Sequence, residues 1–372
     1  MRINVFGIRG FPGVQGGVEK HCEGLYPRLA SDNVDLKVFR RKPYLSKESE
    51  KTYKHIIFND GWTIKNKFLE TPIHSLLAAF KTIKDHPDVV HIHNIAAATT
   101  LPMLKLFGLK CVVTYHSANY EHSKWNWFAK LCLRTAEKIV FLFADRIIFV
   151  SDDKFNSTSI KKSKAVFIPN GVPDLSGLKP SIKLSKFGLK KSSYILSVGR
   201  IVPEKRFSDL IEAFSRIDSK MKLVIVGGYD NHAAYFKELM KYKPKLKDRL
   251  IFTGVMQSND LKLLYENAFC FVLPSENEGM PIVLLEAMSL GIYPLVSDIK
   301  PNLRVVKDRG MSFRVKDIDD LKNKLEHLIR RPVMVRKQRS NIISSIKEEC
   351  DWEKVAEKTL SVYKEALNEK KL

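Results

Sequence analysis

The sequence contains no apolar run long enough to cross a membrane as a helix. Its longest central run, residues 139–144, is ended by Asp145 and Arg146, whereas a membrane-spanning helix needs about 20 largely apolar residues. The N-terminus lacks the long apolar stretch and the small-residue cleavage site of a secretory signal. We therefore expect a cytoplasmic protein without a transmembrane helix.

Cysteine is scarce, and its spacing is typical of neither a disulfide framework nor a zinc site. The five cysteines are odd in number and lie far apart, without paired metal-ligand spacing. We expect reduced, structural thiols, no disulfide and no bound metal. These residues are Cys22, Cys111, Cys132, Cys270 and Cys350.

A dinucleotide-binding fingerprint is also missing. In GIRGFPGVQGGVE, which follows an expected strand at residues 3–7, the glycines do not have the GxGxxG spacing. Gly16 and Gly17 nevertheless allow the backbone to approach an anionic ligand closely, just before a helix that carries Glu19. The segment predicts a ligand-binding loop, and a plain turn is the alternative.

Positive charge, in contrast, is present in excess. The 372 residues carry a formal net charge of +22, and the content of 44% hydrophobic and 28% charged residues is typical of a folded globular protein. Such a charge attracts nucleic acid, anionic lipid headgroups or a phosphorylated substrate, although scattered lysines also serve solubility. The length predicts about two domains, each with its own core.

Short apolar strands alternate with amphipathic helices along both halves of the chain. This rhythm predicts an α/β protein of two Rossmann-like, doubly wound domains with parallel sheets and a substrate cleft between them. The expected strands are residues 3–7, 36–39, 89–93, 111–115, 146–150, 194–198, 222–226, 250–252 and 269–273. The expected helices are residues 18–30, 72–84, 125–143, 208–216, 261–267 and 321–329.

The segment 170–193 is rich in Pro, Gly, Ser and Lys and predicts an exposed connector between the two domains. We therefore place an N-terminal domain at 1–175 and a C-terminal domain at 176–350. Apolar residues at helical spacing after Asp351 predict a terminal amphipathic helix. We expect this segment, 351–372, to pack back toward the N-terminal domain.

The segment PSENEGMPIVLLEAM has the features of a nucleotide diphosphate site. Glu278 precedes a turn and a helix that begins near Pro281, whereas Glu286 lies on that helix. The amides of Gly279, Met280 and their neighbours at the helix N-terminus could hold a diphosphate, and Glu286 could accept hydrogen bonds from ribose hydroxyls. An isolated pair of glutamates would be read as solvated carboxylates, but the sequence between them favours the site.

Two cations follow the first expected strand of the second half. In VGRIVPEKRF, strand 194–198 ends at Gly199, and Arg200 and Lys205 come next. An arginine fork and a lysine charge at this edge of a sheet would neutralise a pyrophosphate and the charge that grows when the glycosidic bond breaks. Two cations in one loop are weak evidence by themselves.

The segments GGVE, GRIVPEK and EGMPIVLLEAM, in this order and spacing, resemble glycosyltransferase family 4 over essentially the whole chain. The resemblance implies the GT-B fold, a nucleoside diphosphate sugar as donor, retention of anomeric configuration, and no metal or other cofactor. It also implies that Arg200 and Lys205 bind the donor phosphates, that Glu286 binds the ribose and that Glu278 lies beside the transferred sugar. Gly17 matches the family glycine that approaches the donor phosphate.

The segment TYHSANYEHSKW resembles the family loop in which a histidine follows an inner strand. By this resemblance His116 faces the donor sugar and supports the developing charge, and a structural role is the alternative. In the common form a glycine follows the histidine, but here Ser117 and Ala118 follow, with Asn119 and Glu121 nearby. The contacts to sugar and acceptor therefore stay open.

Two further patterns resemble metal sites. His91 and His93 share one face of an expected strand, and most such histidines are structural. Asp317 and Asp319 form a DxD sequence before the helix at 321–329, where acidic residues favour a helix N-terminus. Both patterns are better explained by structure than by a metal ion.

A basic and aromatic stretch lies around the expected helix 125–143. Its cations alternate with large apolar residues, which predicts a face that rests on the anionic lipid headgroups of the inner leaflet. Core packing explains the apolar residues equally well. These residues are Lys124, Trp125, Trp127, Phe128, Lys130, Leu131, Arg134 and Lys138.

The leading hypothesis is transfer of a sugar from a nucleoside diphosphate donor to a hydroxyl of a growing surface polysaccharide or polyprenyl-linked oligosaccharide. Such transfer occurs in capsule, O-antigen or lipopolysaccharide assembly. The C-terminal domain, 176–350, would then bind the nucleotide sugar, and the N-terminal domain, 1–175, would be the acceptor-side domain. The alternatives are a non-hydrolysing sugar-nucleotide epimerase on the same fold, and a nucleic-acid-binding protein motivated by the charge alone. No recognised nucleic-acid motif is present, so we expect no nucleic-acid partner.

The sequence leaves the transferred sugar and the nucleotide base open. RGFPGVQGGVE resembles polysaccharide-assembly members, which include some rhamnosyltransferases. Rhamnose from a deoxythymidine donor therefore stands beside glucose, galactose and their N-acetyl forms from uridine donors.

Overall fold

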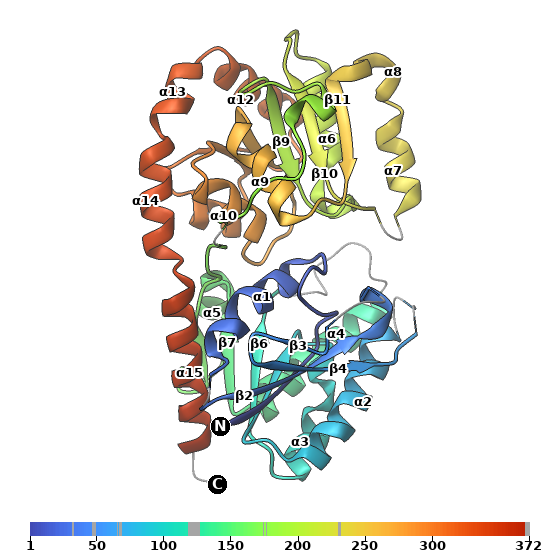
Figure 1. Ribbon diagram of the computed structural model, residues 1–372, viewed down its shortest axis with the longest axis vertical. Helices are drawn as coiled ribbons and strands as arrows, with labels where there is room; N and C mark the ends of the chain where they lie inside the picture. The colour runs from blue at the N-terminus through green and yellow to red at the C-terminus, as the bar shows by residue number, and fades with distance from the viewer. Residues whose placement is uncertain are drawn as a thin grey trace. The chain divides into compact units, whose positions relative to one another are not determined.

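The structure is a computed structural model that describes residues 1–31, 33–46, 50–64, 66, 69–117, 127–173, 175, 177–229 and 232–368. The chain divides into two compact units (Figure 1). The first unit combines Met1–Gly171 with Cys350–Leu372, and the second unit is Val172–Glu349. The C-terminal segment is therefore part of the same compact unit as the N-terminal half.

The first unit is built on a sheet with the strand order β3-β4-β2-β1-β5-β6-β7-β8. All neighbouring strands are parallel except the short β3, which pairs antiparallel with β4. The strands are β1 (Arg2–Phe6), β2 (Asp35–Arg41), β3 (Thr52–Tyr53), β4 (Ile56–Gly61), β5 (Val89–His93), β6 (Cys111–Tyr115), β7 (Arg146–Phe149) and β8 (Ala165–Phe167).

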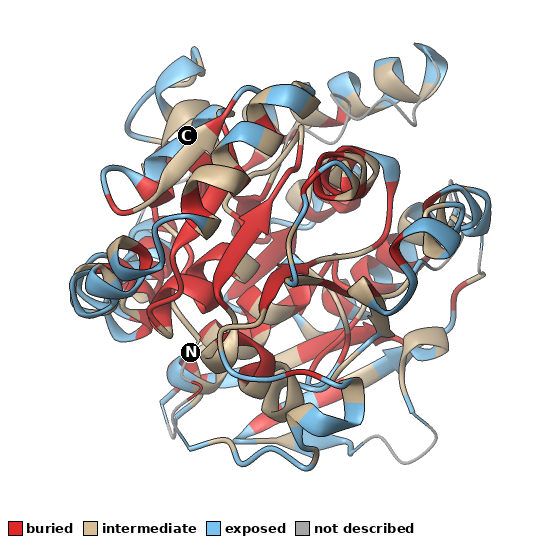
Figure 2. Cartoon of the chain, turned by 90° about the horizontal axis from the view of Figure 1, so that it is seen from above, coloured by how far each residue is buried: buried red, intermediate tan, exposed pale blue. Residues whose placement is uncertain are grey.

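Helices cover both faces of this sheet, which is why its central strands are almost continuously apolar and buried. On one face, α1 (Gly17–Leu29) and α15 (Trp352–Asn368) share a core with the strands. On the other face, α2 (Glu70–Asp85), α3 (Leu101–Leu106) and α4 (Trp127–Phe143) form a second core. In Figure 2, where the chain is seen from above, buried strand segments are red and the outer sides of many helices are pale blue, which marks exposed residues. The remaining helical segments of this unit are η1 (Lys42–Tyr44), η2 (Ala97–Thr100) and α5 (Asp152–Ser157).

The second unit has a fully parallel sheet in the order β11-β10-β9-β12-β13-β14. Its strands are β9 (Tyr194–Val198), β10 (Lys222–Val226), β11 (Leu250–Gly254), β12 (Cys270–Leu273), β13 (Pro294–Ser297) and β14 (Met311–Phe313). Its helices are η4 (Leu184–Phe187), η5 (Pro203–Lys205), α6 (Phe207–Ser215), α7 (Ala233–Met240), α8 (Lys243–Leu246), η6 (Lys247–Arg249), α9 (Ser258–Asn267), α10 (Ile282–Ser289), α11 (Lys300–Val306), α12 (Ile318–Ile329), α13 (Pro332–Lys337) and α14 (Arg339–Glu349).

Both sheets have the topology of a doubly wound α/β fold, in which the strand order reverses beside the first strand. The reversal falls between β1 and β5 in the first sheet and between β9 and β12 in the second. In such sheets, ligands bind outside the carboxyl ends of the strands at this point. The segments that follow β1 and β9 are those in which the sequence predicts ligand contacts.

Each strand expected from the sequence is present, within a few residues at its ends. The strands β3, β4, β8, β13 and β14 were not anticipated. Most of them have only two to four residues, too few to establish an alternating or continuous apolar pattern, and β13 begins with proline. The helix expected from residue 125 is described from Trp127 onward, because residues 118–126 lie outside the described part of the chain.

The C-terminal helix α15 packs on α1 through Trp352. A Cβ added at Gly24 would come within 2.4 Å of the Trp352 ring, and one added at Gly171 within 2.2 Å. An ion pair of 2.7 Å between Arg28 Nε and Glu353 Oε1 joins the same two helices at the surface. The tryptophan thus fills a space that only glycines leave open.

Across the described residues, no helix combines the length and the apolar character needed to cross a bilayer.

Candidate active site

Two of the predicted residues meet at the carboxyl edge of the second sheet. β9 leads through Gly199 and Arg200 into η5, which contains Lys205, and β12 leads into the loop that contains Glu278. Because β9 and β12 are paired neighbours, these loops lie side by side, and Lys205 Nζ forms an ion pair with Glu278 Oε1. Both side chains are mostly buried, so this edge holds a desolvated pair of opposite charges.

Backbone contacts hold the loops around this pair in place. The amide of Glu276 donates to the Glu204 carbonyl at 3.0 Å, which ties the two loops together. Gly227, with φ +150°, brings the end of β10 so close that an added Cβ would lie 1.9 Å from the Gly199 oxygen. Only glycine allows this approach, so the three strand ends form one continuous edge.

Arg200 is placed for an anionic ligand. It is half-buried beside Gly199, and no described residue forms a hydrogen bond or an ion pair with its guanidinium. Its planar fork can bind two oxygens of a phosphate at once. The predicted phosphate-binding pair therefore consists of one cation shared with Glu278 and one that is open to a ligand.

The predicted segment 278–286 folds as expected, with Glu278 before α10 and Glu286 on it. The helix begins at Ile282 with Pro281 as N-cap, and no described side chain caps it. Gly279, Met280 and Pro281 lead into this helix. Because Pro281 has no N–H, the first amides of α10 are those of Ile282 and Val283, which stand at the positive end of a helix without a side-chain cap, where a phosphate binds.

Glu286 is buried, and its carboxylate accepts a hydrogen bond of 3.0 Å from the Tyr265 hydroxyl. Burial and the neighbouring Glu286 carboxylate raise the pKa of Tyr265, so its hydroxyl stays protonated and donates. A carboxylate has about four acceptor positions, which leaves capacity for ribose hydroxyls. Tyr265, which fixes the orientation of this carboxylate, was not found from the sequence because it lies on α9, a separate element.

The remaining predicted residues, Gly16, Gly17 and His116, belong to the first unit. Gly16 is the N-cap of α1, and a Cβ at this position would collide with the Glu19 carboxylate at 1.9 Å. That carboxylate folds back to accept the Arg9 amide at 3.0 Å. Gly17 is exposed, and an added Cβ would meet nothing within 4 Å, so the helix begins with an open surface of bare backbone.

His116 follows β6 and is part of a buried group of histidines. Its Nε2 shares a hydrogen bond of 2.9 Å with Nδ1 of His93, and the two rings stack. The His21 ring, one turn of α1 beyond Gly17, packs edge-on against His116. Burial lowers the pKa of His116 well below its usual value, so the ring is neutral. Any support it gives to a substrate is that of a hydrogen bond rather than a positive charge.

A hydrogen-bonded chain continues from His93 into the interior. The Tyr26 hydroxyl contacts Nε2 of His93 and Nδ1 of His91, and His91 Nδ1 also contacts the Tyr363 hydroxyl of α15 at 2.6 Å. His91 Nε2 shares a further bond of 2.7 Å with Thr114 Oγ1. Burial keeps both tyrosines protonated by raising their pKa values. The chain fixes the ring orientations of His91, His93 and, through them, His116.

Three histidines, His21, His93 and His116, each offer a ring nitrogen within 4.8 Å of the others and could hold a metal ion. This set differs from the His91 and His93 pair that the sequence suggested. His93 and His116 already share a hydrogen bond through their ring nitrogens, and His21 Nδ1 lies 2.8 Å from Asn170 Oδ1. The sequence could have indicated His21, because it lies on α1 four residues after Gly17.

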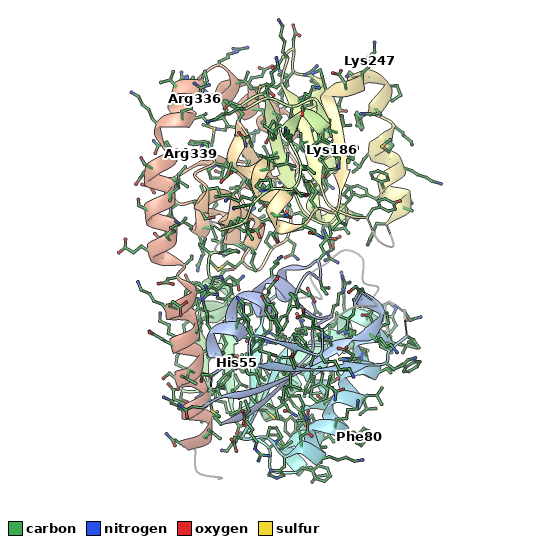
Figure 3. The ribbon with its side chains drawn as sticks, viewed as in Figure 1. His55, Phe80, Lys186, Lys247, Arg336 and Arg339 are labelled. Atoms are coloured by element: carbon green, nitrogen blue, oxygen red, sulfur yellow. The ribbon has the colours of Figure 1, made fainter. Side chains whose placement is uncertain are left out.

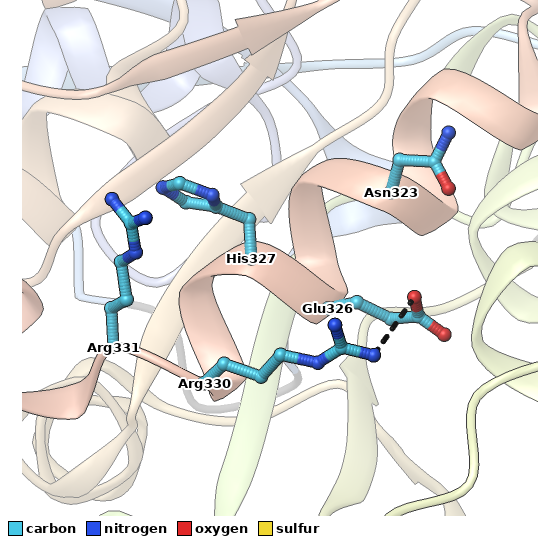
Figure 4. Close-up of a pocket in the computed structure, with 5 residues that line it drawn as sticks. All are labelled: Asn323, Glu326, His327, Arg330 and Arg331. Atoms are coloured by element: carbon cyan, nitrogen blue, oxygen red, sulfur yellow. Dashed lines mark ion pairs between the residues drawn. The ribbon is translucent and has the colours of Figure 1, made fainter.

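The DxD sequence caps a helix. The Asp317 carboxylate accepts the Asp320 amide at 2.8 Å at the N-terminus of α12, and Asp319 pairs with Arg216. The predicted residues Asn119, Glu121, Lys124 and Trp125 lie outside the described residues. The pocket in Figure 4 lies on α12 and is lined by Asn323, Glu326, His327, Arg330 and Arg331, none of which is a predicted site residue.

Comparison with known proteins identifies the family of this chain. Residues 15–174 match the family described as Glycosyltransferase Family 4, and residues 182–349 match Glycosyl transferases group 1. The UDP-Gal:alpha-D-GlcNAc-diphosphoundecaprenol alpha-1,3-galactosyltransferase of Escherichia coli is 31% identical over 283 residues, which cover 70% of this chain and 71% of that enzyme. The chain belongs to glycosyltransferase family 4.

A second relative of this glycosyltransferase is the GDP-mannose:cellobiosyl-diphosphopolyprenol alpha-mannosyltransferase of Xanthomonas oryzae pv. oryzae. It is 26% identical over 243 residues, which cover 61% of this chain and 60% of that enzyme. The solved sucrose-phosphate synthase of Thermosynechococcus elongatus has a TM-score of 0.84, with 20% identity over 98% of both chains. The fold is therefore GT-B, and the relatives support a transferase rather than the epimerase or the nucleic-acid-binding protein.

Proposed function

We propose that this glycosyltransferase moves a sugar, with retention of configuration, from a nucleoside diphosphate donor to a hydroxyl of a polyprenyl-linked glycan. The edge formed by β9, β12 and α10 carries this proposal, because it combines a buried Lys–Glu pair, an open arginine and an uncapped helix N-terminus. Each of these features favours a bound diphosphate. The acceptor class is suggested by the relatives, whose names specify diphosphopolyprenol-linked acceptors.

In the proposed donor complex, Arg200 and Lys205 bind the diphosphate with the α10 amides, and Glu286 accepts the ribose hydroxyls. Glu278, held by Lys205, lies beside the transferred sugar. No carboxylate is assigned as a covalent nucleophile, and the leaving phosphate guides the acceptor's proton while the cations stabilise its charge. By the family resemblance, Gly16, Gly17 and His116 of the first unit are predicted to contribute backbone and imidazole contacts to the donor.

We also propose that the reaction needs no metal, because Arg200 and Lys205 supply the positive charge that a metal would otherwise bring to the diphosphate. The donor base stays open, because the relatives named above use uridine and guanosine donors. The proposed place of action is the inner face of the cytoplasmic membrane, where a polyprenyl-linked acceptor is anchored.

A panel of nucleotide sugars tests the donor assignment. We expect one base and sugar to raise the melting temperature and to turn over with a polyprenyl-linked glycan, with and without a chelator. Lys205→Ala is expected to lower turnover about 100-fold or more, the cost typical of losing one group that stabilises transition-state charge. Glu286→Ala is expected to lower turnover at limiting donor at least about tenfold, because the ribose loses hydrogen bonds to a charged acceptor. Steady-state kinetics and circular dichroism measure turnover and folding separately.

Lys222→Ala provides the matched control. Lys222 is half-buried at the N-terminal end of β10, away from the carboxyl edge of the sheet, and pairs with the exposed Asp248. Its loss is therefore expected to leave turnover within about twofold, as is usual for an ion pair with an exposed partner. Near-normal turnover in both site variants would contradict the proposed donor site. Sugar-nucleotide isomerisation without an acceptor would instead support the epimerase.

A further inference from the structure

The helix layer formed by α2, α3 and α4 leaves an unusual number of large apolar side chains in contact with solvent. Ten of the eighteen exposed large apolar residues among those described belong to this layer or its helix ends. The opposite layer of the same sheet, α1 and α15, contributes Leu367 alone. The ten are Leu69, Leu76, Leu77, Phe80, Leu106, Phe107, Trp127, Phe128, Leu131 and Leu142, and we call this set the apolar face.

The three helices form one continuous layer on the sheet. Their inner side chains, such as Ala79, Leu104 and Val140, belong to a single core. The short helix η2 contacts both α2 and α4, and α3 contacts α4 (Figure 1). Phe80 extends outward from α2 in Figure 3. The exposed residues therefore lie on the outer side of one layer and are not scattered over the molecule.

Helix α4 shows most clearly that the exposure follows from packing. Only Ala136 and Val140 of its seventeen residues are buried. At 3.6 residues per turn, Trp127 and Leu131 lie on the side of the helix opposite to this pair, and so does Leu142. They are 77%, 53% and 69% exposed. Large apolar residues that face water at both ends of one helix side indicate a binding surface.

Cations accompany the apolar residues on the same side of α4. Arg134 and Lys138 are exposed and lie within one turn of Leu131 and Leu142, respectively, and Lys130 is half-buried next to them. Two acids of α4 and its C-terminal end, within the described part of the chain, face inward: Glu137 accepts the Tyr115 hydroxyl at 2.5 Å, and Asp145 accepts Lys105 Nζ at 2.8 Å. The described outer side of α4 is therefore basic.

We infer that the apolar face, with the cations of α4, docks this enzyme on an anionic lipid bilayer. Trp127, Phe128 and Leu131 would enter the boundary between headgroups and acyl chains, while Lys138 binds lipid phosphates. A second copy of the chain fits less well, because a two-fold contact would set these cations against their own counterparts. The inference rests on the proposed function in one respect, because a polyprenyl-linked acceptor would give the enzyme a reason to dock on a membrane. The exposed side chains are observed whatever the acceptor is.

The full chain tests this inference directly in vesicle sedimentation. We expect it to bind vesicles of phosphatidylglycerol and phosphatidylcholine, to bind pure phosphatidylcholine much more weakly, and to be released by salt because charges at a surface are screened. The triple variant Trp127→Ser, Phe128→Ser and Leu131→Ser should bind anionic vesicles at least about tenfold more weakly, since it removes buried apolar area from the bilayer. These side chains are exposed, so folding should be unaffected.

A matched control is available in the second unit. Val255 and Val333 are 60% and 64% exposed but lie outside the α2–α4 layer. The double variant Val255→Ser and Val333→Ser should bind vesicles like the unchanged chain. Equal vesicle binding by the triple variant and the unchanged chain would overturn the inference. Sedimentation velocity showing a dimer that the triple variant converts to a monomer would overturn it in favour of a second copy.

Activity supplies a second measurement. Turnover with a water-soluble acceptor analogue separates the docking inference from the proposed function. The triple variant should turn this analogue over like the unchanged chain. If the proposed function were wrong, neither the unchanged chain nor any variant would turn it over.

Discussion

Lys205 and Glu278 are each other's ion-pair partners in the structure, although the sequence suggested two independent roles. The pair is mostly buried, so each charge depends on the other to offset its desolvation. Removing Lys205 would therefore leave Glu278 unpaired as well as the phosphate unbound. Loss of turnover in Lys205→Ala has to be compared with Glu278→Gln, which removes the carboxylate charge and leaves the lysine free for the donor.

Gly17 allows a clean test at the scale of one residue. Gly17→Ala should leave the free energy of unfolding within about 0.5 kcal/mol, because the added Cβ meets nothing within 4 Å. The same methyl group would stand where the donor phosphate is expected to approach the backbone. We predict that kcat/KM for the donor falls at least about tenfold, since even small displacements of a bound substrate are costly.

Gly177→Ala is the matched control for this substitution, because its Cβ would also meet nothing within 4 Å. Thermal melts and donor kinetics are to be measured for both variants. A kcat/KM for Gly17→Ala equal to that of Gly177→Ala would show that the donor does not approach this part of α1.

At the scale of secondary-structure elements, α10 shows why a short helix can act as a binding site. Seven of its eight residues are buried, so its position depends on packing and not on an exposed polar side. The sequence indicated the helix correctly through its proline and its apolar run. It could not indicate Tyr265, which reaches Glu286 from α9, because that contact depends on how two helices pack on one sheet.

Helix α15 provides the second test at this scale. Trp352 is buried between Gly24 and Gly171, so Trp352→Ala leaves a large cavity in the core of the first unit. We predict a loss of about 3–5 kcal/mol in the free energy of unfolding, as is typical for an aromatic residue truncated to alanine in a core. Urea unfolding, followed by circular dichroism, measures this loss of free energy.

The same helix supplies the control. Leu367 is exposed near its C-terminal end, and Leu367→Ala should cost less than about 0.5 kcal/mol. A Trp352→Ala variant as stable as Leu367→Ala would mean that α15 is not needed for the stability of the first unit.

At the scale of the whole molecule, the buried histidines make stability depend on pH. Burial lowers the pKa of His21 to about 4 and that of His91 to about 3, and it lowers the pKa values of His93 and His116 well below normal. Below pH 6.5 the unfolded chain therefore binds protons that the folded chain does not. As the pH falls, each of these histidines lowers the free energy of unfolding by up to about 1.4 kcal/mol per pH unit.

We predict that the melting temperature is nearly constant above pH 6.5 and drops steeply between pH 6.5 and about 4. Thermal melts across this range measure the slope. His91→Gln should reduce the slope, even if it lowers the melting temperature itself, whereas His327→Gln on α12, outside the group, should leave the slope unchanged. A flat profile in the unchanged chain would contradict neutral buried histidines.

The sequence by itself determined the family and the alternation of strands and helices, and it predicted the donor-site residues. These follow from local signals: apolar runs, glycine and proline at turns, and acids or cations at fixed distances along the chain. The carboxyl ends of parallel strands meet at one edge of a sheet, so the strand pattern alone placed Arg200, Lys205 and Glu278 together. The ion pair between Lys205 and Glu278 did not follow from that pattern.

Only the tertiary structure decided which side chains are buried together and which are left in water. The histidine chain joins α1, β5, β6 and α15, and no spacing in the sequence predicts contacts between elements so far apart. The apolar residues of α4 could equally have filled a core, and the structure leaves Trp127 and Leu131 outside. Periodicity shows that a helix has an apolar side, but whether another element covers that side depends on the packing of the whole unit.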